Sequence, residues 1–357
     1  LKSFINKEFN EWNEYKQKIS LDYLIEYKDK KSKNAKLLTN FYPIDDLQFF
    51  LGLNRDYFSV SKHSFSNILD CNETGSFTVL KTDRYGFINN DNLWSHQDLD
   101  FMIIGDSNAQ GQCIDQEYNF SYLLNNKNLK GLNLGMAGNG PFLNLATFKE
   151  YSKQKKINNL IYIHTEQNDL NDLNYEKKFK FFSKYLDNLD HNLINLTNKI
   201  DKDLYQRHLI NLDNLAKISD KKISNNILDF FKFRNVRKLF KNFHKDSKFN
   251  DYDLNTFSKI IDNLNENKTH TDQKIIFIYL PTIKSFSNNT NYDRNNIKNE
   301  IKELVVNKNI DFIDFKMEIE SFDVNFEKLY TMGKFGGHLS IYGNLILSKI
   351  INNYLIT

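Results

Sequence analysis

Short apolar runs alternate with segments of helical periodicity along much of the chain. The runs lie at residues 100–105, 131–134, 159–165, 274–280 and 309–315. They are rich in Ile, Leu, Phe and Tyr, as expected of strands that are buried on both faces. Segments with helical spacing follow or separate these apolar runs, at residues 117–126, 142–154, 295–308 and 339–355. This alternation predicts an α/β fold, with a parallel sheet covered by helices on both faces.

Two regions interrupt this alternation. Residues 1–80 are polar and aromatic-rich, with few clear strands, and are predicted to form an N-terminal extension. Residues 174–270 contain charged helical segments and are predicted to be a helical insertion at the rim of the sheet. The α/β core is therefore assigned to residues 81–173 and 271–357. Within the insertion, the spacing of apolar residues in segment 231–245 favours an amphipathic helix that packs on the core. The alternative is a basic lid.

Composition and charge exclude some classes of function. The chain has 48 basic and 45 acidic residues, a net charge of +3, which argues against a nucleic-acid partner. No apolar run approaches the roughly 20 residues of a membrane-spanning helix. The chain begins with Leu, so a signal or membrane anchor outside it stays open. The spacing of its two cysteines fits neither a zinc site nor a redox motif.

Polar residues follow the predicted strands at their carboxyl ends, where open α/β sheets bind ligands. Residues 105–107 (Gly-Asp-Ser) follow the first strand, the glycine-rich segment 135–140 the second, and residues 167–169 (Gln-Asn-Asp) the third. His338 precedes the last helix. A serine, a loop of backbone donors, an amide and an imidazole together provide the groups that acyl transfer requires.

Each of these features has an ordinary structural interpretation when taken alone. Ser107 is a favoured helix cap, the glycines suit a tight turn, and Asn168 suits an Asx turn. A single histidine near a terminal helix is usually structural. Because all four arrive in order at successive strand ends, we favour the catalytic interpretation.

Four segments resemble the sequence blocks of the SGNH (GDSL-type) hydrolase superfamily. They are "GDSNAQG" (105–111), "NLGMAGNG" (133–140), "EQNDL" (166–170) and "GGHLSIYGN" (336–344). "TDRYGF" (82–87) resembles a segment that often precedes the first block in SGNH-like proteins of bacterial surface-polysaccharide pathways. The resemblance implies a flavodoxin-like three-layer α/β/α sandwich, whose five-stranded parallel sheet has the strand order 2-1-3-4-5.

The resemblance also implies a role for each residue of the blocks. Ser107 would be the nucleophile and His338 the base. The oxyanion hole would consist of the Ser107 N–H, the Gly138 N–H and the Asn168 side chain. Neighbouring residues are expected to bind substrate: Asp106, Asn139 and Gln167. Gln167 replaces a glycine of the third block, which either narrows the site, adds an amide to it, or is a tolerated surface change.

One position departs from the pattern. The superfamily places an Asp three residues before the catalytic His, and this chain has Phe335 there. Phenylalanine cannot accept a hydrogen bond from the imidazole. Four interpretations stay open: a backbone carbonyl that holds the ring in a Ser-His dyad, which we favour; Asp314; Glu166; or an impaired site that binds without turnover.

The resemblance implies a serine esterase or O-acyltransferase that acts on small acyl groups, such as acetyl, of a carbohydrate. Water or a sugar hydroxyl would be the acceptor, and no metal or organic cofactor is required. The alternative is a catalytically impaired SGNH-like protein that binds or helps to assemble a surface polysaccharide. A periplasmic or membrane-associated location is expected. There, a Cys71–Cys113 disulfide would fasten the N-terminal extension beside the active site.

Overall fold

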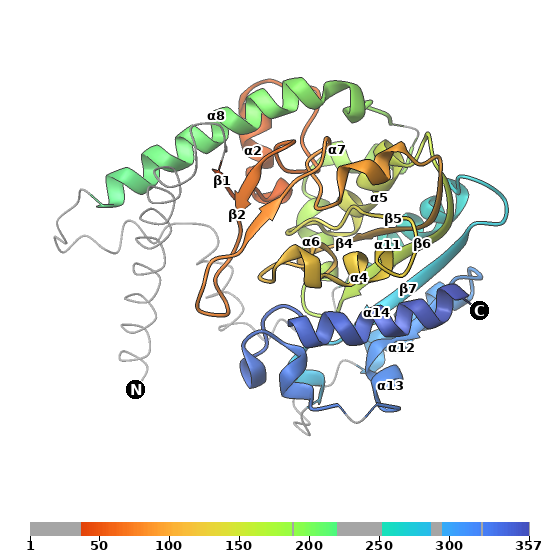
Figure 1. Ribbon diagram of the computed structural model, residues 1–357. Coiled ribbons are helices and arrows are strands. Elements are labelled where there is room, and N and C mark those ends of the chain that lie inside the picture. Colours follow the sequence, from red (N-terminus) through yellow and green to blue (C-terminus); the bar gives the residue numbers. More distant parts are fainter. Residues whose placement is uncertain (1–36, 188, 220–251, 287–294, 323, 357) are drawn as a thin grey trace.

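The computed structural model describes residues 37–187, 189–219, 252–286, 295–322 and 324–356, and segment 231–245 lies outside them (Figure 1). A five-stranded sheet forms the centre, and all of its strand pairs are parallel. The strand order is β5-β4-β6-β7-β8, which is 2-1-3-4-5 for the core strands and confirms the predicted fold. The strands are β4 (Asp98–Gly105), β5 (Gly131–Asn133), β6 (Lys156–Thr165), β7 (Lys274–Leu280) and β8 (Asp311–Asp314).

Successive residues of the central strands face opposite helix layers. In β4, Phe101 and Ile103 pack in one apolar cluster, whereas Met102 and Ile104 pack in the other. The first layer contains α4 (Phe120–Asn125), α13 (Phe315–Ile319) and α14 (Ile341–Ile356). The second contains α5 (Pro141–Tyr151), α11 (Leu254–Glu266) and α12 (Asn295–Val306). Because both faces are covered, the strands are continuous apolar runs.

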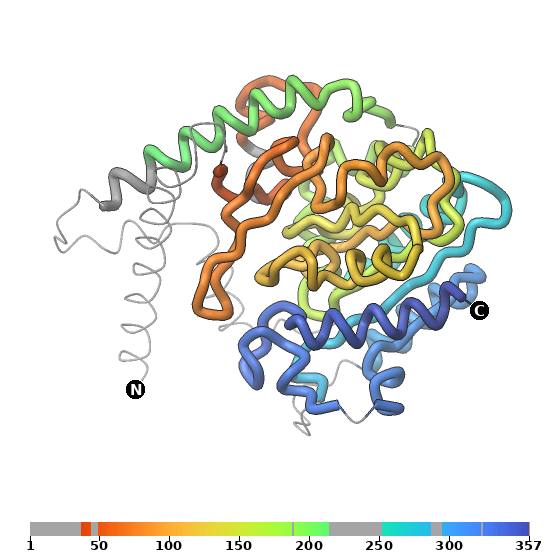
Figure 2. The backbone as a smooth tube through the Cα atoms, in the orientation of Figure 1, coloured from red at the N-terminus to blue at the C-terminus, as the bar shows by residue number. Residues whose placement is uncertain are grey.

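The segment predicted to be an insertion contributes to both the core and the N-terminal extension. It contains the end of α6 (Asp169–Glu176), then α7 (Lys180–Ser183), α8 (Leu193–Ser219) and α11. α11 buries four apolar side chains in the second layer: Phe257, Ile260, Ile261 and Leu264. α8 instead lies along the extension, as Figure 2 shows, and Asp203 on it forms an ion pair with Arg55 at 2.8 Å.

The N-terminal extension has a small sheet of its own. β1 (Leu37–Thr39) pairs in parallel with β2 (Asn67–Leu69), which pairs antiparallel with β3 (Val79–Lys81). α2 (Pro43–Gly52) follows β1. The loop 70–78 joins β2 to β3 and carries Cys71 to its partner Cys113, to which it is joined by a disulfide.

The remaining described helices are short. They are α3 (Ser107–Gln110) and five 3₁₀ turns: η1 (Asp91–Ser95), η2 (Gln116–Tyr118), η3 (Ile283–Phe286), η4 (Phe326–Leu329) and η5 (Gly333–Phe335). Among the described residues, no helix has both the length and the apolar character needed to cross a membrane.

Asp83, in the segment "TDRYGF", organises the junction between extension and core. Its buried carboxylate accepts hydrogen bonds from the backbone N–H groups of Tyr85 and Phe87, from Asn89 Nδ2 and from Trp94 Nε1. Burial raises the pKa of Asp83 to about 6, although these hydrogen bonds oppose the shift. Asn89 continues the junction, because it exchanges two hydrogen bonds with the backbone of β5. The segment therefore has a clear structural role.

Gly86 makes this junction sensitive to substitution. It has φ +85°, and a Cβ at this position would lie 1.8 Å from the carbonyl oxygen of Lys62. We predict that Gly86→Ala lowers the free energy of unfolding by about 3 kcal/mol or more, because positive φ and a backbone clash combine. Gly75→Ala is the matched control. Its φ is +95°, but no atom lies within 4 Å of the added Cβ, so the expected loss is about 1 kcal/mol. Urea unfolding of both variants measures the difference, and equal losses would contradict the clash.

Candidate active site

Ser107 lies at the turn from β4 into α3. Asp106 caps this helix by accepting the Asn108 N–H at 2.9 Å. Gly105 precedes them with φ +153°, and a Cβ there would lie 2.8 Å from the carbonyl oxygen of Ile163. The close approach to β6 therefore requires glycine. The Ser107 side chain emerges at the carboxyl end of the sheet, and its Oγ lies 2.9 Å from His338 Nε2. The sequence blocks predicted that these two groups meet, and the structure brings them within hydrogen-bond distance.

The loop before α14 holds His338 through its backbone. The Leu339 N–H donates to Asn108 Oδ1 at 3.0 Å, which ties this loop directly to the helix that begins with Ser107. The His338 carbonyl accepts the Thr331 N–H at 2.9 Å. Because Asn108 is the neighbour of Ser107, the distance between serine and imidazole is set by short covalent and hydrogen-bonded connections.

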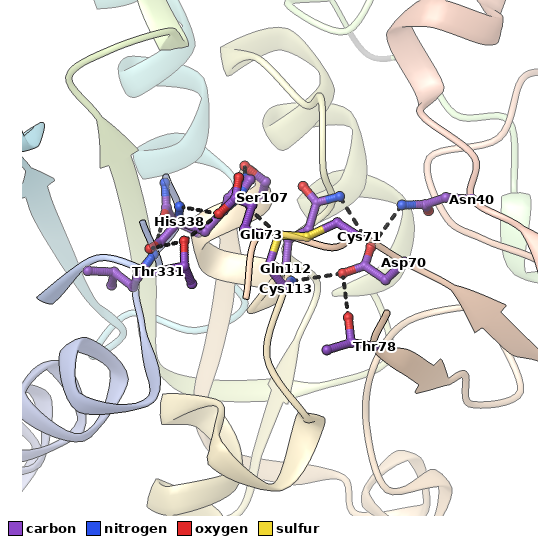
Figure 3. The surroundings of a disulfide bond; sticks show 12 residues. Asn40, Asp70, Cys71, Glu73, Thr78, Ser107, Gln112, Cys113, Thr331 and His338 are labelled. Atoms are coloured by element: carbon purple, nitrogen blue, oxygen red, sulfur yellow. Dashed lines mark hydrogen bonds and ion pairs between the residues drawn. A yellow bond between two sulfur atoms is a disulfide. The ribbon is translucent and has the colours of Figure 1, made fainter. Parts of the chain in front are cut away.

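Glu73, from the N-terminal extension, orients the imidazole (Figure 3). Its Oε1 lies 3.0 Å from His338 Nδ1, and its Oε2 accepts the His338 backbone N–H at 3.0 Å. The Thr331 hydroxyl also donates to Oε2. The favoured expectation of a backbone carbonyl was wrong, because a carboxylate from a distant segment takes this position.

The two carboxylates considered from the sequence are engaged elsewhere. Asp314 caps α13 through the Lys316 N–H and forms an ion pair with Lys298 at 2.7 Å. Glu166 accepts the Thr282 N–H at 2.9 Å and hydrogen bonds from Tyr279 and Ser285. Neither therefore orients His338, which corrects both expectations.

Phe335 and Gly337 show how the loop accommodates an acid from outside it. The Phe335 side chain is 77% exposed and points away from the buried side of the loop. Gly337 has φ +90°, and a Cβ there would lie 2.7 Å from Glu73 Oε2. A side chain at position 337 would therefore displace the carboxylate.

No motif in the sequence identified Glu73 as a candidate site residue. It is 265 positions from His338, and the superfamily pattern places the acid near the histidine. One signal pointed to its neighbourhood: Cys71, two residues earlier, was expected to pair with Cys113 near Ser107. A search for carboxylates beside that cross-link would have found "CNE" at residues 71–73.

The charges of Glu73 and His338 stabilise each other. Burial disfavours the ionised form of Glu73, but hydrogen bonds from His338 and its charge outweigh burial and lower the pKa to about 2. Burial likewise disfavours protonated His338, but Glu73 outweighs it and raises the pKa of His338 above its usual value. Since an ionised carboxylate only accepts hydrogen bonds, Nδ1 carries the proton. The lone pair of neutral Nε2 then faces the Ser107 hydroxyl.

The Gly138 loop presents backbone donors close to this assembly. Gly138 has φ +85°, a conformation that favours glycine. Ala137 N donates to Gln110 Oε1 at 2.9 Å, and Gly140 N donates to the buried carboxylate of Glu176 at 2.9 Å. Within the described part of the chain, no hydrogen-bond acceptor faces the N–H of Ser107 or of Gly138. Both groups are therefore available to an oxyanion.

Asn168 lies at the start of α6, and its amide is held by two carboxylates. Its Nδ2 donates to Asp106 Oδ2 and to Asp172 Oδ2, each at 3.0 Å. Asp106 is completely buried and also accepts the Thr165 hydroxyl at 3.0 Å. Burial raises the pKa of Asp106, although the hydrogen bond from Asn168 opposes the shift. Asp106 thus positions Asn168.

The expected substrate contacts need revision. Asp106 and Asn139 are both 0% exposed, so the structure offers a substrate neither side chain. Gln167 is exposed beside Asn168, and its contact with substrate stays a prediction.

One group of side chains among the described residues has the spacing of a metal site. The ligand atoms of Cys71, Cys113 and His338 lie within 4.8 Å of one another. A metal would bind the thiolates, however, and the disulfide between Cys71 and Cys113 occupies both sulfurs. In this state the donor set does not fit a metal.

Comparisons with known proteins find solved structures of limited similarity and low sequence identity. No family model and no curated protein matches the chain. It is similar to a member of the lipolytic G-D-S-L family from Veillonella parvula, with 11% identity, a TM-score of 0.34, and coverage of 70% of this chain and 93% of that one. A variant of an acetyl xylan esterase from Geobacillus stearothermophilus has 12% identity, a TM-score of 0.38, and coverage of 72% and 94%. A two-domain esterase active on acetylated mannans has 11% identity, a TM-score of 0.36, and coverage of 74% of this chain and 50% of that one. At these values no residue role is transferred to this chain.

The pairing of Glu73 with His338 predicts a change in the pKa of His338 that can be measured without substrate. We expect Glu73→Gln to lower the pKa of His338, because burial then acts without the compensating carboxylate. Titration of the His338 ring by NMR measures the shift. Glu166→Gln and Asp314→Asn are matched controls that should leave this pKa unchanged. An unchanged pKa in Glu73→Gln would contradict the assignment.

Proposed function

We propose that the protein is a serine esterase or O-acyltransferase that acts on small acyl groups of a carbohydrate. The observation that carries the proposal is the continuous hydrogen-bonded series from Ser107 Oγ through the His338 imidazole to Glu73. Its two connecting distances are 2.9 and 3.0 Å. A nucleophile, a base and an acid that orients the base are the groups that acyl transfer through serine requires.

The first half of the reaction forms an acyl-enzyme. Ser107 Oγ attacks the ester carbonyl, and its proton passes to His338 Nε2. Glu73 stabilises the imidazolium that results and keeps Nδ1 protonated. The N–H groups of Ser107 and Gly138 stabilise the oxyanion. When the tetrahedral intermediate collapses, the carbon–oxygen bond to the alcohol breaks and Nε2 returns the proton to the leaving oxygen.

The second half transfers the acyl group. Water or a sugar hydroxyl gives its proton to Nε2 and attacks the acyl carbon. The bond from the acyl carbon to Ser107 Oγ then breaks, and Nε2 returns the proton to Oγ. Asn168 takes part as an oxyanion donor once its amide exchanges Asp172 for the oxyanion. This exchange retains the hydrogen bond to the buried Asp106, which keeps the amide in place.

The acyl group, the sugar and the location rest on weaker support than the chemistry. The four sequence blocks resemble the SGNH superfamily, and "TDRYGF" resembles a segment that often precedes the first block in SGNH-like proteins of bacterial surface-polysaccharide pathways. The second resemblance supports an acylated carbohydrate as substrate. A disulfide that fastens the site supports a periplasmic or membrane-associated location, because disulfides persist in oxidising compartments.

The alternative, a catalytically impaired polysaccharide-binding protein, was based on the missing Asp at Phe335. Glu73 supplies the carboxylate that this alternative assumed to be absent. No other feature of the described residues favours it, and we retain the enzyme as the proposal.

Acyl-enzyme formation tests the proposal directly. We expect incubation with an activated acetyl ester, p-nitrophenyl acetate, to add one acetyl group to the intact protein, visible by mass spectrometry, and to release p-nitrophenol. Ser107→Ala should abolish both signals. The control is Ser183→Ala, which removes an exposed hydroxyl whose one partner among the described residues is the nearby Lys180 carbonyl, and it should behave as wild type. A folded wild-type protein with neither adduct nor turnover would favour the binding protein.

Asn168 provides a second test. We expect Asn168→Ala to lower kcat about 10²- to 10³-fold, because one oxyanion donor is lost. KM should change little if the donor acts mainly in the transition state. Asn171→Ala is the matched control, since within the described ranges this exposed amide bonds to the Gln167 carbonyl alone. Loss confined to KM would show that Asn168 binds substrate without stabilising the oxyanion.

A further inference from the structure

We propose that the Cys71–Cys113 disulfide positions Glu73 against His338, so that opening the disulfide removes the acid from the active site. Catalysis would then depend on the redox state of this cysteine pair. The kinetic part of this inference rests on the proposed function, whereas its geometric part does not.

The disulfide joins the segments of Glu73 and Ser107 at the point where both meet His338 (Figure 3). Cys71 is two residues before Glu73, and Cys113 follows the helix that begins with Ser107. The two Cα atoms are 5.1 Å apart, and Cys113 Sγ lies 3.3 Å from His338 Nδ1. The cross-link therefore connects the loop of the acid to the segment of the nucleophile, in contact with the base.

Hydrogen bonds hold the base of this loop at Asp70, the residue before Cys71. Asp70 accepts from Asn40 Nδ2, Gln112 Nε2 and the Cys113 backbone N–H at 2.8 to 3.2 Å. These bonds stay when the disulfide opens, so the loop should remain attached to the core at Asp70.

Beyond Cys71 the loop has few anchors of its own. Residues 74–76 are exposed, and among the described residues the segment 72–76 makes no backbone hydrogen bond. Glu73 is the residue of this segment that hydrogen-bonds to the core, through His338 and Thr331. Without the disulfide, these bonds and the hydrogen bond from the Thr78 N–H to the Cys71 carbonyl at 3.1 Å would have to offset the conformational entropy of the loop.

The two cysteines differ in burial, and this difference determines from which side a reductant reaches the disulfide. Cys113 is 1% exposed and has φ +73°, a conformation that the surrounding contacts must maintain. Cys71 is half-buried, so a dithiol reaches the disulfide from its side. In the exchange the dithiol is oxidised to a disulfide, the Cys71–Cys113 bond breaks and two protein thiols form.

The experiment compares opening of the disulfide in two backgrounds. Cys71→Ala/Cys113→Ala is made in wild type and in Glu73→Gln, and wild type and Glu73→Gln are also reduced with dithiothreitol after folding. Hydrolysis of p-nitrophenyl acetate, the pKa of His338 by NMR, and the melting temperature are measured. The double-alanine variant treated with dithiothreitol controls for effects of the reductant itself. If that variant fails to fold, the reduced wild type provides the same comparison.

We expect opening of the disulfide in wild type to lower kcat at least about tenfold, toward the kcat of Glu73→Gln. In Glu73→Gln itself, opening of the disulfide should cause no further loss of kcat. The pKa of His338 should fall in wild type alone. A lower melting temperature with unchanged kcat and unchanged pKa would overturn the inference, because the disulfide would then only stabilise the fold. Equal losses of kcat in both backgrounds would also overturn it.

The same measurements separate this inference from the proposed function. If the oxidised wild type has no esterase activity but the pKa of His338 falls on opening, the proposed function fails and the positioning of Glu73 stands. If the enzyme is active and the pKa does not respond, the proposed function stands and the inference fails.

Discussion

The hydrogen bond between Glu73 and His338 is the interaction on which the rest of the site depends. It fixes the imidazole so that Nε2 faces Ser107, and it supplies the negative charge that stabilises an imidazolium. It also joins two segments that are 265 positions apart in the sequence, the N-terminal extension and the loop before α14. The extension is thus part of the candidate active site, although the core sheet is complete without it.

The extension is attached to the core at two places with different chemistry. At the first, the buried carboxylate of Asp83 gathers four donors, and Asn89 connects this loop to β5. At the second, the disulfide closes a segment with a sequence separation of 42 residues. In the chain-entropy model, a loop of this length stabilises the folded state by about 4 kcal/mol. The two attachments lie on either side of β3, so together they restrict how the loop 70–78 can approach the site.

The core and half of the site could be predicted from the sequence, because both depend on local pattern. Continuous apolar runs predicted strands buried on both faces, and the right-handed rule for parallel connections limits how such strands are ordered. Ser107, Gly138 and Asn168 follow strand ends directly, so predicting the strands also predicted where these residues lie. His338 followed because a serine nucleophile needs a base. Asp106 and Asn139 were misjudged, since a position next to a catalytic residue does not show which way a side chain points.

Glu73 could not be predicted in this way, because its position depends on a tertiary contact and a cross-link that no periodicity encodes. Phe335 showed that the acid was missing from its usual place but not where the replacement came from.

The pH response of the site follows from the pKa shifts of its ionisable groups. Glu73, with its pKa lowered to about 2, contributes stability that is present above about pH 4 and is lost as pH falls through its folded pKa. Asp83 acts in the opposite sense: its folded pKa of about 6 means that its contribution weakens as pH rises from about 4 to 6. His338, whose pKa Glu73 raises, must lose its proton to serve as the base of the proposed mechanism, so that mechanism requires a pH above the folded pKa of His338. At such a pH the charge pair between Glu73 and His338 is lost and the contribution of Asp83 is weakened, whereas the disulfide does not titrate. This difference is a physical reason for holding the extension covalently as well as by charge.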